Sequence, residues 1–223
     1  MLSKLIPNQL NLNFLNFRKN KMNESKKEMT NKQLDPAWTF NVDKIETWAY
    51  INNFLSPEEC KAVIDFGNSL ALQDGTTAGE KLAYIRDSKI AWIYPEPDIH
   101  WLYRKLTDAI MDMNTRFFGF NLYGITEGIQ FTKYNSPGGR YGKHIDKAYN
   151  GRIRKLSISI QLSDPQDYEG GELLLWNDEE PTQTLKEQGS AIIFPSYSLH
   201  EVMPVTKGTR YSLVIWVSGE PFK

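Results

Sequence analysis

Hydrophobic and polar residues alternate in the second half of the chain, in a pattern typical of β-strands. The segment LSISIQL, residues 156–162, has four aliphatic side chains on one face and Ser157, Ser159 and Gln161 on the other, as in a strand with one polar face. The segments EGGELLLW, GSAIIFP and RYSLVIWV predict further strands, joined by short links rich in turn residues. Several short strands in succession predict an antiparallel double sheet or a barrel.

Two helices are predicted ahead of these strands. In SPEECKAVIDFGNSL, Ser56 is suited to cap a helix, Pro57 to its first position and Glu59 to complete a capping box. In DIHWLYRKLTDAIMDMNTRFF, apolar residues recur near the helical period; they are Trp101, Leu102, Leu106, Ile110, Met113 and Phe117. The predicted fold class is therefore α+β, with helices that brace a sheet rather than carry the chemistry.

The first 34 residues differ in composition from the rest of the chain. They are rich in asparagine and lysine and contain no long hydrophobic block, and Pro7 interrupts the apolar residues that are present. This composition is typical of a disordered segment rather than of a secretory signal. We therefore expect a disordered leader over residues 1–34 and one folded domain over residues 35–223.

Composition narrows the choice of partners and compartment. The net charge of -1 disfavours a broad electrostatic surface for nucleic acid or for an anionic membrane. No apolar run approaches the roughly 18 residues that a membrane-spanning helix needs. The single cysteine, Cys60, cannot form an internal disulfide, which indicates a reducing environment. These features predict a cytoplasmic protein without a membrane or nucleic-acid partner.

Two of the three histidines have a spacing that suits a metal ion. In RYGKHIDKAYN, His144 and Asp146 are two positions apart, so on a strand their side chains share a face. In FPSYSLHEVMPV, His200 begins a strand that is distant in sequence but can be adjacent in a barrel. Two imidazoles and one carboxylate form the facial triad of non-haem iron oxygenases, although hydrogen-bonded structural histidines are an alternative. His100 has no such spacing and is interpreted as structural.

An arginine begins the last predicted strand. In GTRYSLVIWVSG, Arg210, Ser212, Val214 and Trp216 share one face. A buried lone charge is costly, and a planar guanidinium can hold a carboxylate through two parallel hydrogen bonds. A ligand carboxylate or an internal salt bridge would satisfy Arg210. Together with a metal triad, a carboxylate anchor favours a metal-chelating dicarboxylate as ligand.

Over residues 48–218 the chain resembles the Fe(II)/2-oxoglutarate-dependent dioxygenases, and within them the prolyl 4-hydroxylase-like branch. The similarity is strongest in QFTKYNSPGGRYGKHID, LSDPQDYEGGELLLW and HEVMPVTKGTRYSLVIW. The resemblance implies a double-stranded β-helix, a jelly-roll or cupin-like barrel, braced by the N-terminal helices. It also implies that three residues bind Fe(II), namely His144, Asp146 and His200.

The same resemblance implies the ligand contacts and the reaction. Arg210 and Ser212 would hold the distal carboxylate of 2-oxoglutarate, and Tyr134 would hydrogen-bond this cosubstrate. The reaction would hydroxylate a prolyl residue of a protein or peptide, using O2 and converting 2-oxoglutarate to succinate and CO2, with ascorbate as a candidate cofactor. A free amino acid or another small molecule is the alternative substrate. Animal and plant prolyl 4-hydroxylases often have lysine in place of Arg210, which weakens the case for collagen-like targets.

Three residues are candidates for the opening where a substrate enters. They are Arg86, Trp176 and Trp216. Prolyl hydroxylases have comparable arginines at the rim, which favours Arg86 by resemblance. Core packing is the alternative role of the two tryptophans.

Three other functions use part of the same pattern. A zinc hydrolase could use the same metal ligands but would leave Arg210, Ser212 and Tyr134 without a role. Nucleic-acid demethylases of this superfamily typically have a second arginine six residues after the position of Arg210, where this chain has Trp216. A binding module derived from an oxygenase would usually have lost a metal ligand, and none is missing here. The oxygenase is therefore the favoured interpretation.

Overall fold

The computed structural model describes residues 46–76, 84–146, 148–149 and 151–221. The predicted leader over residues 1–34 and the predicted domain start at residue 35 lie outside these ranges and stay predictions. The chain divides into two units, residues 1–43 and residues 44–223. All elements described below belong to the second unit.

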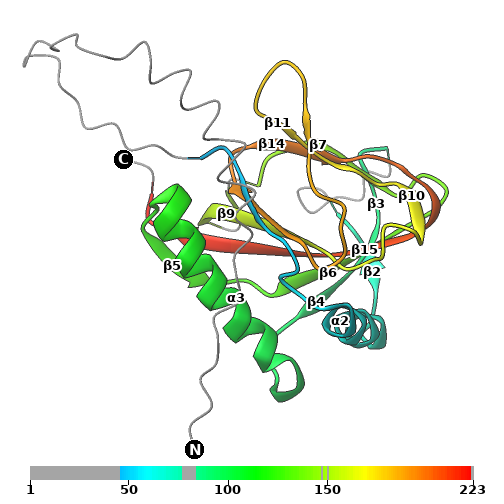
Figure 1. The fold of residues 1–223 in the computed structure, drawn as a ribbon, viewed down its shortest axis with the longest axis horizontal. Coiled ribbons are helices and arrows are strands. Elements are labelled where there is room, and N and C mark those ends of the chain that lie inside the picture. The colour runs from blue at the N-terminus through cyan, green and yellow to red at the C-terminus, as the bar shows by residue number, and fades with distance from the viewer. Residues whose placement is uncertain (1–45, 77–83, 147, 150, 222–223) are drawn as a thin grey trace, which may run out of the picture. The chain divides into compact units, whose positions relative to one another are not determined.

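Antiparallel strands in two sheets form most of this unit (Figure 1). The larger sheet has the order β1 (Ala49–Ile51), β13 (Ala191–Pro195), β9 (Arg152–Gln161), β15 (Val205–Gly219), β6 (Ile129–Asn135), β4 (Lys89–Ile93) and β2 (Gln73–Asp74). The strands that extend it are β10 (Tyr168–Gly170) and β5 (Leu122–Ile125), which pair with β15, and β8 (Ala148–Tyr149), which pairs with β9. The smaller sheet has the order β12 (Thr182–Gln183), β11 (Leu173–Trp176), β14 (Leu199–Val202), β7 (Arg140–His144) and β3 (Arg86–Asp87).

The two sheets face each other without closing into a barrel. Across the described residues, β1 and β2 are the ends of the larger sheet, β12 and β3 are the ends of the smaller one, and no ladder joins the two. The end strands β12, β3 and β2 have two residues each, which is too short to continue the pairing from one sheet into the other. The predicted α+β class and double sheet are confirmed, and the predicted barrel is corrected to two open sheets.

Helix α2 (Pro57–Ser69) begins as the sequence predicts. The Ser56 hydroxyl accepts a hydrogen bond from Glu59 N at 3.2 Å, and Ser56 N donates to the Glu59 carboxylate at 2.8 Å. Pro57 occupies the first helical position, where its missing N–H costs nothing. The buried side of the helix packs against the larger sheet through Cys60, Val63 and the backbone at Gly67.

Helix α3 (His100–Met113) follows a short 3-10 turn, η2 (Pro97–Ile99), and continues into a π-helical turn, η3 (Asn114–Phe118). The predicted apolar stripe is confirmed, because the helix buries Leu102, Leu106, Ile110 and Met113. Trp101 and Phe117 are only partly buried and pack against the same core. No helix in the described ranges is both long and apolar enough to cross a bilayer.

The helices and the smaller sheet lie on opposite faces of the larger sheet (Figure 1). On β15, Leu213 and Ile215 pack into the helix-side core. Arg210, Ser212 and Trp216 alternate with them and border a cavity on the other side, towards the smaller sheet. This is the division of faces that the sequence predicts for the strand.

Strand β9 is divided in the same way, but its polar face is not exposed. Ser157, Ser159 and Gln161 are 0%, 6% and 2% exposed. They lie opposite the aliphatic face of the strand, which packs into the helix-side core. The alternation in LSISIQL therefore marks a strand between an apolar core and a polar interior, rather than a strand at the solvent boundary.

Our first prediction concerns the contact between α2 and the larger sheet. A Cβ atom at Gly67 would lie 2.5 Å from Cγ of Phe131, a fully buried ring on β6. Alanine favours a helix over glycine by about 1 kcal/mol, but overpacking a closed core costs about 1–3 kcal/mol. We expect Gly67→Ala to lower the free energy of unfolding, measured by urea denaturation, by up to about 2 kcal/mol, the difference between these two contributions. Asn68→Ala, on the exposed side of the helix, is the control, and a stabilised Gly67→Ala protein would contradict this packing.

Candidate metal centre and adjoining cavity

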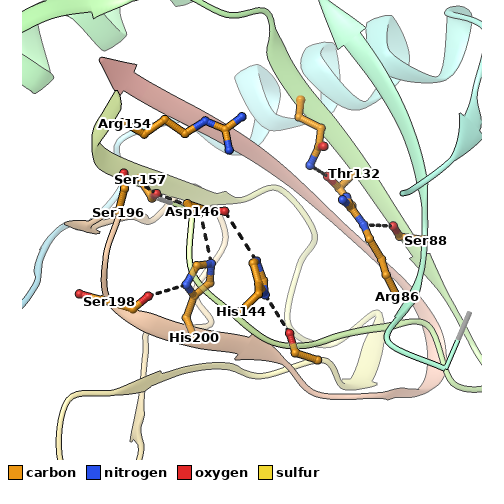
Figure 2. Close-up of polar contacts among 12 residues, drawn as sticks. Arg86, Ser88, Thr132, His144, Asp146, Arg154, Ser157, Ser196, Ser198 and His200 are labelled. Carbon is orange, nitrogen blue, oxygen red and sulfur yellow. Dashed lines mark hydrogen bonds and ion pairs between the residues drawn. The ribbon is translucent and has the colours of Figure 1, made fainter. Parts of the chain in front are cut away.

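Strand pairing brings the two predicted histidine ligands together. Strands β7 and β14 are antiparallel neighbours, and His144 pairs with His200 in their register. The two imidazole centroids are 4.1 Å apart. Asp146 lies two residues beyond the end of β7, rather than on the strand as predicted, and its N–H donates to Ser196 O at 2.8 Å. One strand pair and one backbone hydrogen bond thus assemble the set shown in Figure 2.

The three side chains converge on one small volume. Nε2 of His144 is 3.8 Å from Oδ1 of Asp146, and Nε2 of His200 is 3.4 Å from Oδ2. The ligand atoms of all three residues lie within 4.8 Å of one another. The side chains of His144, Asp146 and His200 are 13%, 8% and 7% exposed. Within the part of the chain that the structure describes, no other group of His, Cys, Asp and Glu has this arrangement.

Backbone carbonyls fix the orientation of both imidazoles. Nδ1 of His144 lies 2.8 Å from Gly142 O, and Nδ1 of His200 lies 2.9 Å from Ser198 O (Figure 2). A carbonyl oxygen can only accept, so each neutral ring donates from Nδ1 and keeps its lone pair on Nε2. Both lone pairs are then available beside Asp146, which is the arrangement found around metal-bound histidines.

Burial and charge set the protonation of this group. Burial, together with the neighbouring His200, lowers the pKa of His144 to about 4. Burial opposes ionisation of Asp146, but attraction and hydrogen bonding from His200 outweigh it and hold the pKa of this carboxyl below its usual range. Burial likewise lowers the pKa of His200, yet the attraction of Asp146 raises it overall. A metal ion bound here would therefore meet a neutral His144 and an ionised Asp146, and would compete with a proton only at His200.

An irregularity in β7 adds an aromatic ring to the site. His144 pairs with His200, and Tyr141 pairs with Val202. Tyr141 and His144 are three positions apart on β7, whereas their partners are two positions apart on β14, so β7 contains one extra residue, a β-bulge. The bulge brings Tyr141 to the same side as His144, where the two rings stack with centroids 3.5 Å apart. Regular alternation would put these residues on opposite faces, so the sequence pattern gives no sign that Tyr141 belongs to the site.

Arg210 is buried without an acidic partner. It is 1% exposed; Nη2 donates to Gln161 Oε1 at 2.8 Å and Nη1 to Ser212 Oγ at 3.4 Å, while Nε has no hydrogen-bond partner. The internal salt bridge that the sequence left open is not found among the described residues. A buried cation without a counter-ion favours an anionic ligand.

The surroundings of Arg210 make room for its side chain and limit its position. Gly171 has φ +66°, and a Cβ atom there would lie 2.9 Å from Cδ of Arg210. Tyr134 pairs with Arg210 across β6 and β15, and its ring centroid is 5.3 Å from the guanidinium carbon. The second glycine of EGGELLLW, Gly171, is therefore required for steric reasons, because a side chain at this position would displace Arg210.

A cavity between the sheets joins the metal set to Arg210. Its lining contains the predicted metal residues and the predicted cosubstrate residues, with apolar side chains around them. The lining residues are Gln130, Tyr134, Tyr141, His144, Asp146, Ile158, Ser159, Leu173, Phe194, His200, Val202, Arg210, Ser212, Val214 and Trp216. The structure thus brings together residues from both sheets that are up to 86 positions apart, from Gln130 to Trp216.

Two of the predicted substrate residues do not line this cavity. Arg86 is buried beside it, where its Nε donates to Ser88 Oγ at 2.9 Å and its guanidinium carbon is 4.4 Å from the centroid of Tyr141. Trp176 donates from Nε1 to the Glu201 carboxylate at 2.8 Å, and its ring stacks under the ammonium group of Lys143. Substrate roles for Arg86 and Trp176 stay predictions.

Two further polar residues were missed although the sequence marked their strand face. Ser157 Oγ donates to Oδ2 of Asp146 at 2.9 Å, and Gln161 accepts from Arg210. Both belong to the polar face of LSISIQL. The alternating polar face of this strand was the available signal, because a protein that binds a metal ion and a dicarboxylate needs buried polar side chains around them.

A facial set of two imidazoles and one carboxylate, joined by a cavity to an unpaired guanidinium, defines the class of metal-dependent oxygenases. Comparison with known proteins agrees. The sequence profile described as the 2OG-Fe(II) oxygenase superfamily matches residues 129–218. A PKHD-type hydroxylase of Prochlorococcus marinus is 45% identical over 93 residues, which cover 41% of this chain and 42% of that protein. A PKHD-type hydroxylase of Nitrosomonas eutropha is 33% identical over 180 residues, which cover 76% of this chain and 77% of that protein.

The chain belongs to the PKHD-type hydroxylases of the 2OG-Fe(II) oxygenase superfamily. A solved structure described as a prolyl hydroxylase in complex with a hypoxia inducible factor peptide fragment, from Trichoplax adhaerens, has a TM-score of 0.67 and 25% identity. The match covers 78% of this chain and 84% of that one. This likeness confirms the predicted double-stranded β-helix fold.

The cofactors of the protein are Fe(II) with 2-oxoglutarate and O2 as cosubstrates. The residues fit these groups on structural grounds. Two Nε2 lone pairs and an ionised carboxylate suit Fe(II). The unpaired cation of Arg210 suits a dicarboxylate, which a zinc hydrolase would not need.

Our second prediction tests the metal ligands, with His100, the histidine outside the metal set, as a matched control. His144→Ala and Asp146→Ala each remove one ligand, so we expect Fe(II) to bind more than about 100-fold more weakly, beyond the usual effect of changing an outer-shell partner. His100→Ala, an exposed position on α3, should bind like the wild type. Anaerobic titration with Fe(II) measures the dissociation constants. A His144→Ala protein with wild-type affinity would exclude this residue as a ligand.

Proposed function

We propose that the protein hydroxylates a prolyl residue of a protein or peptide and couples this reaction to the decarboxylation of 2-oxoglutarate to succinate and CO2. The observation that carries the proposal is the shared cavity of the His144, Asp146 and His200 set and the unpaired Arg210. The likeness to a prolyl hydroxylase that holds a peptide fragment supports a prolyl target in a peptide chain.

In this proposal, His144, Asp146 and His200 hold the iron. The bound iron supplies the O2 activation and the oxidising power for hydroxylation. The backbone acceptors of both imidazoles keep the Nε2 atoms directed at the metal, and the Ser157 hydroxyl holds one oxygen of Asp146. These contacts would limit rotation of the three side chains and so keep their ligand atoms directed at the metal.

The other end of the cavity would hold the distal carboxylate of 2-oxoglutarate. Arg210 offers its unpartnered Nε–H, and Nη1 and Nη2 each keep a second hydrogen beside the bonds to Ser212 and Gln161. Ser212, two residues along the same strand face, and Tyr134, whose ring borders the guanidinium, offer hydroxyl donors. An anionic ligand bound there would pair with a charge that the described residues leave uncompensated.

Apolar walls would exclude water from the reacting groups. Leu173, Phe194, Val202, Val214 and Trp216 border the cavity between the metal set and Arg210. Such a surface is suited to the aliphatic ring of a prolyl residue and lacks a group for a charged side chain. In this proposal Trp216 forms part of the surface that the target ring contacts.

We further propose a cytoplasmic setting, with ascorbate able to sustain turnover by keeping the iron reduced. The single cysteine supports a reducing compartment, because Cys60 has no second cysteine in the chain with which to form a disulfide. Burial raises the pKa of this thiol from 9.0 to about 11, so it stays protonated and shielded from oxidants at physiological pH.

Our third prediction tests the reaction. Protein purified without oxygen and supplied with Fe(II), 2-oxoglutarate and O2 should release succinate slowly, and proline-containing peptides should raise the rate. Mass spectrometry should find a 16 Da gain on proline in the stimulating peptide, the mass of one added oxygen atom. Asp146→Ala should release no succinate. Stimulation by a free amino acid, with no stimulation by peptides, would replace the prolyl peptide with the small-molecule alternative.

Our fourth prediction concerns the cosubstrate anchor. Removing one partner of a buried charge pair costs about 2–5 kcal/mol, so Arg210→Ala should raise the 2-oxoglutarate dissociation constant by roughly 30-fold or more. Arg210→Lys keeps the charge but loses the planar fork of the guanidinium. Its dissociation constant for 2-oxoglutarate should therefore lie between those of the wild type and Arg210→Ala. Anaerobic calorimetry of the metal-loaded protein measures binding, and urea denaturation without ligand measures folding. Unchanged 2-oxoglutarate affinity in Arg210→Ala would assign Arg210 a purely structural role.

A further inference from the structure

A buried ion pair lies next to the cavity but outside its lining. Arg154 on β9 binds Glu127, in the link between β5 and β6, through two hydrogen bonds: Nε to Oε1 at 2.8 Å and Nη2 to Oε2 at 2.6 Å. The side chains are 8% and 5% exposed. Burying two charges is expensive, and apolar residues of similar size are often at least as stabilising. Stability alone therefore gives no reason for an ion pair at this point.

The ion pair holds a cation against Trp216. The guanidinium carbon of Arg154 is 3.8 Å from the centroid of the Trp216 ring, within the range of a cation–π contact. The ring of Trp92 is 6.1 Å away at an angle of 43° and packs beside the same indole. Since Glu127 binds two donors on one edge of the guanidinium, Nε and Nη2, the arginine cannot turn away from the indole without breaking a buried ion pair.

The indole held in this way has a free donor inside the site. Trp216 is 7% exposed, and its Nε1 is buried without a hydrogen-bond partner in the described part of the chain. The indole and the Asp146 carboxylate border the same cavity. Ser157, which pairs with Trp216 across β9 and β15, donates to the same carboxylate at 2.9 Å.

We propose that Arg154 and Glu127 are positioning residues for the metal centre. They hold the Trp216 indole so that its N–H is directed at Asp146, and the indole in turn limits the rotation of the carboxylate that binds the metal. Figure 2 shows Arg154 on the side of Asp146 away from the two imidazoles. The inference rests on the metal centre of the proposed function and does not depend on the prolyl substrate.

The fifth prediction tests this support with Co(II) as the probe, in full-length protein without 2-oxoglutarate. Outer-shell partners typically contribute 10–100-fold to metal affinity. Trp216→Phe keeps an aromatic ring but removes the N–H, and Arg154→Lys keeps the charge but removes the fork. We expect each variant to weaken Co(II) binding by about 10-fold and to change the visible absorption of the bound ion, which reports its ligand geometry. Arg152→Lys, a nearby exposed arginine that donates to Thr126 O, is the matched control and should bind like the wild type.

The double variant Trp216→Phe/Arg154→Lys separates positioning from a general structural effect. If Arg154 acts through the indole, the double variant binds Co(II) no more weakly than Trp216→Phe alone. Losses that multiply, or an Arg154→Lys protein with wild-type affinity and absorption, would overturn the inference. Glu127→Gln replaces Arg154→Lys if the latter does not fold, and the same outcomes apply. Failure of the wild-type protein to bind Co(II) would overturn the metal centre, and the inference with it.

Discussion

The antiparallel pairing of β7 with β14 is the interaction on which the site depends. It sets His144 opposite His200, and the backbone hydrogen bond from Asp146 to Ser196 then adds the carboxylate to this pair. The backbone acceptors at Gly142 and Ser198 orient each imidazole locally, from two residues earlier in the chain, and the strand pairing brings the two oriented rings together. A shift of one residue would turn one histidine to the outer face of the sheet, and no rearrangement of side chains would restore the set.

The rest of the fold supplies a surface opposite this pair. Helices α2 and α3 pack on one face of the larger sheet and form the main hydrophobic core there. The other face of the sheet can therefore carry polar side chains. That second face carries Ser157, Gln161, Arg210 and Ser212, which are buried and polar. A charge as deeply buried as Arg210 is tolerated because its neighbours are hydroxyls, an amide and an aromatic ring rather than aliphatic side chains.

Much of this arrangement could be predicted from the sequence. The capping box at Ser56, the stripe of α3 and the two faces of β15 depend on short-range periodicity, which the chain shows clearly. The candidate ligand residues that the structure brings together could be selected by their spacing, because His144 and Asp146 are close in sequence and only one other histidine begins a strand. What could not be predicted depends on register. The bulge that turns Tyr141 towards His144, the contact of Gln161 with Arg210 and the open edges of both sheets arise between strands that are far apart in sequence.

The two faces of β15 also belong to two separate cores. Its aliphatic side packs with the helices, while its other side borders a second cluster that includes Tyr134, Phe194 and Val202. Substitutions within one cluster therefore have few direct neighbours in the other. The fold therefore assigns the shape of the cavity and the attachment of the helices to largely different side chains. A change in the cavity walls would leave most contacts between the helices and the larger sheet in place.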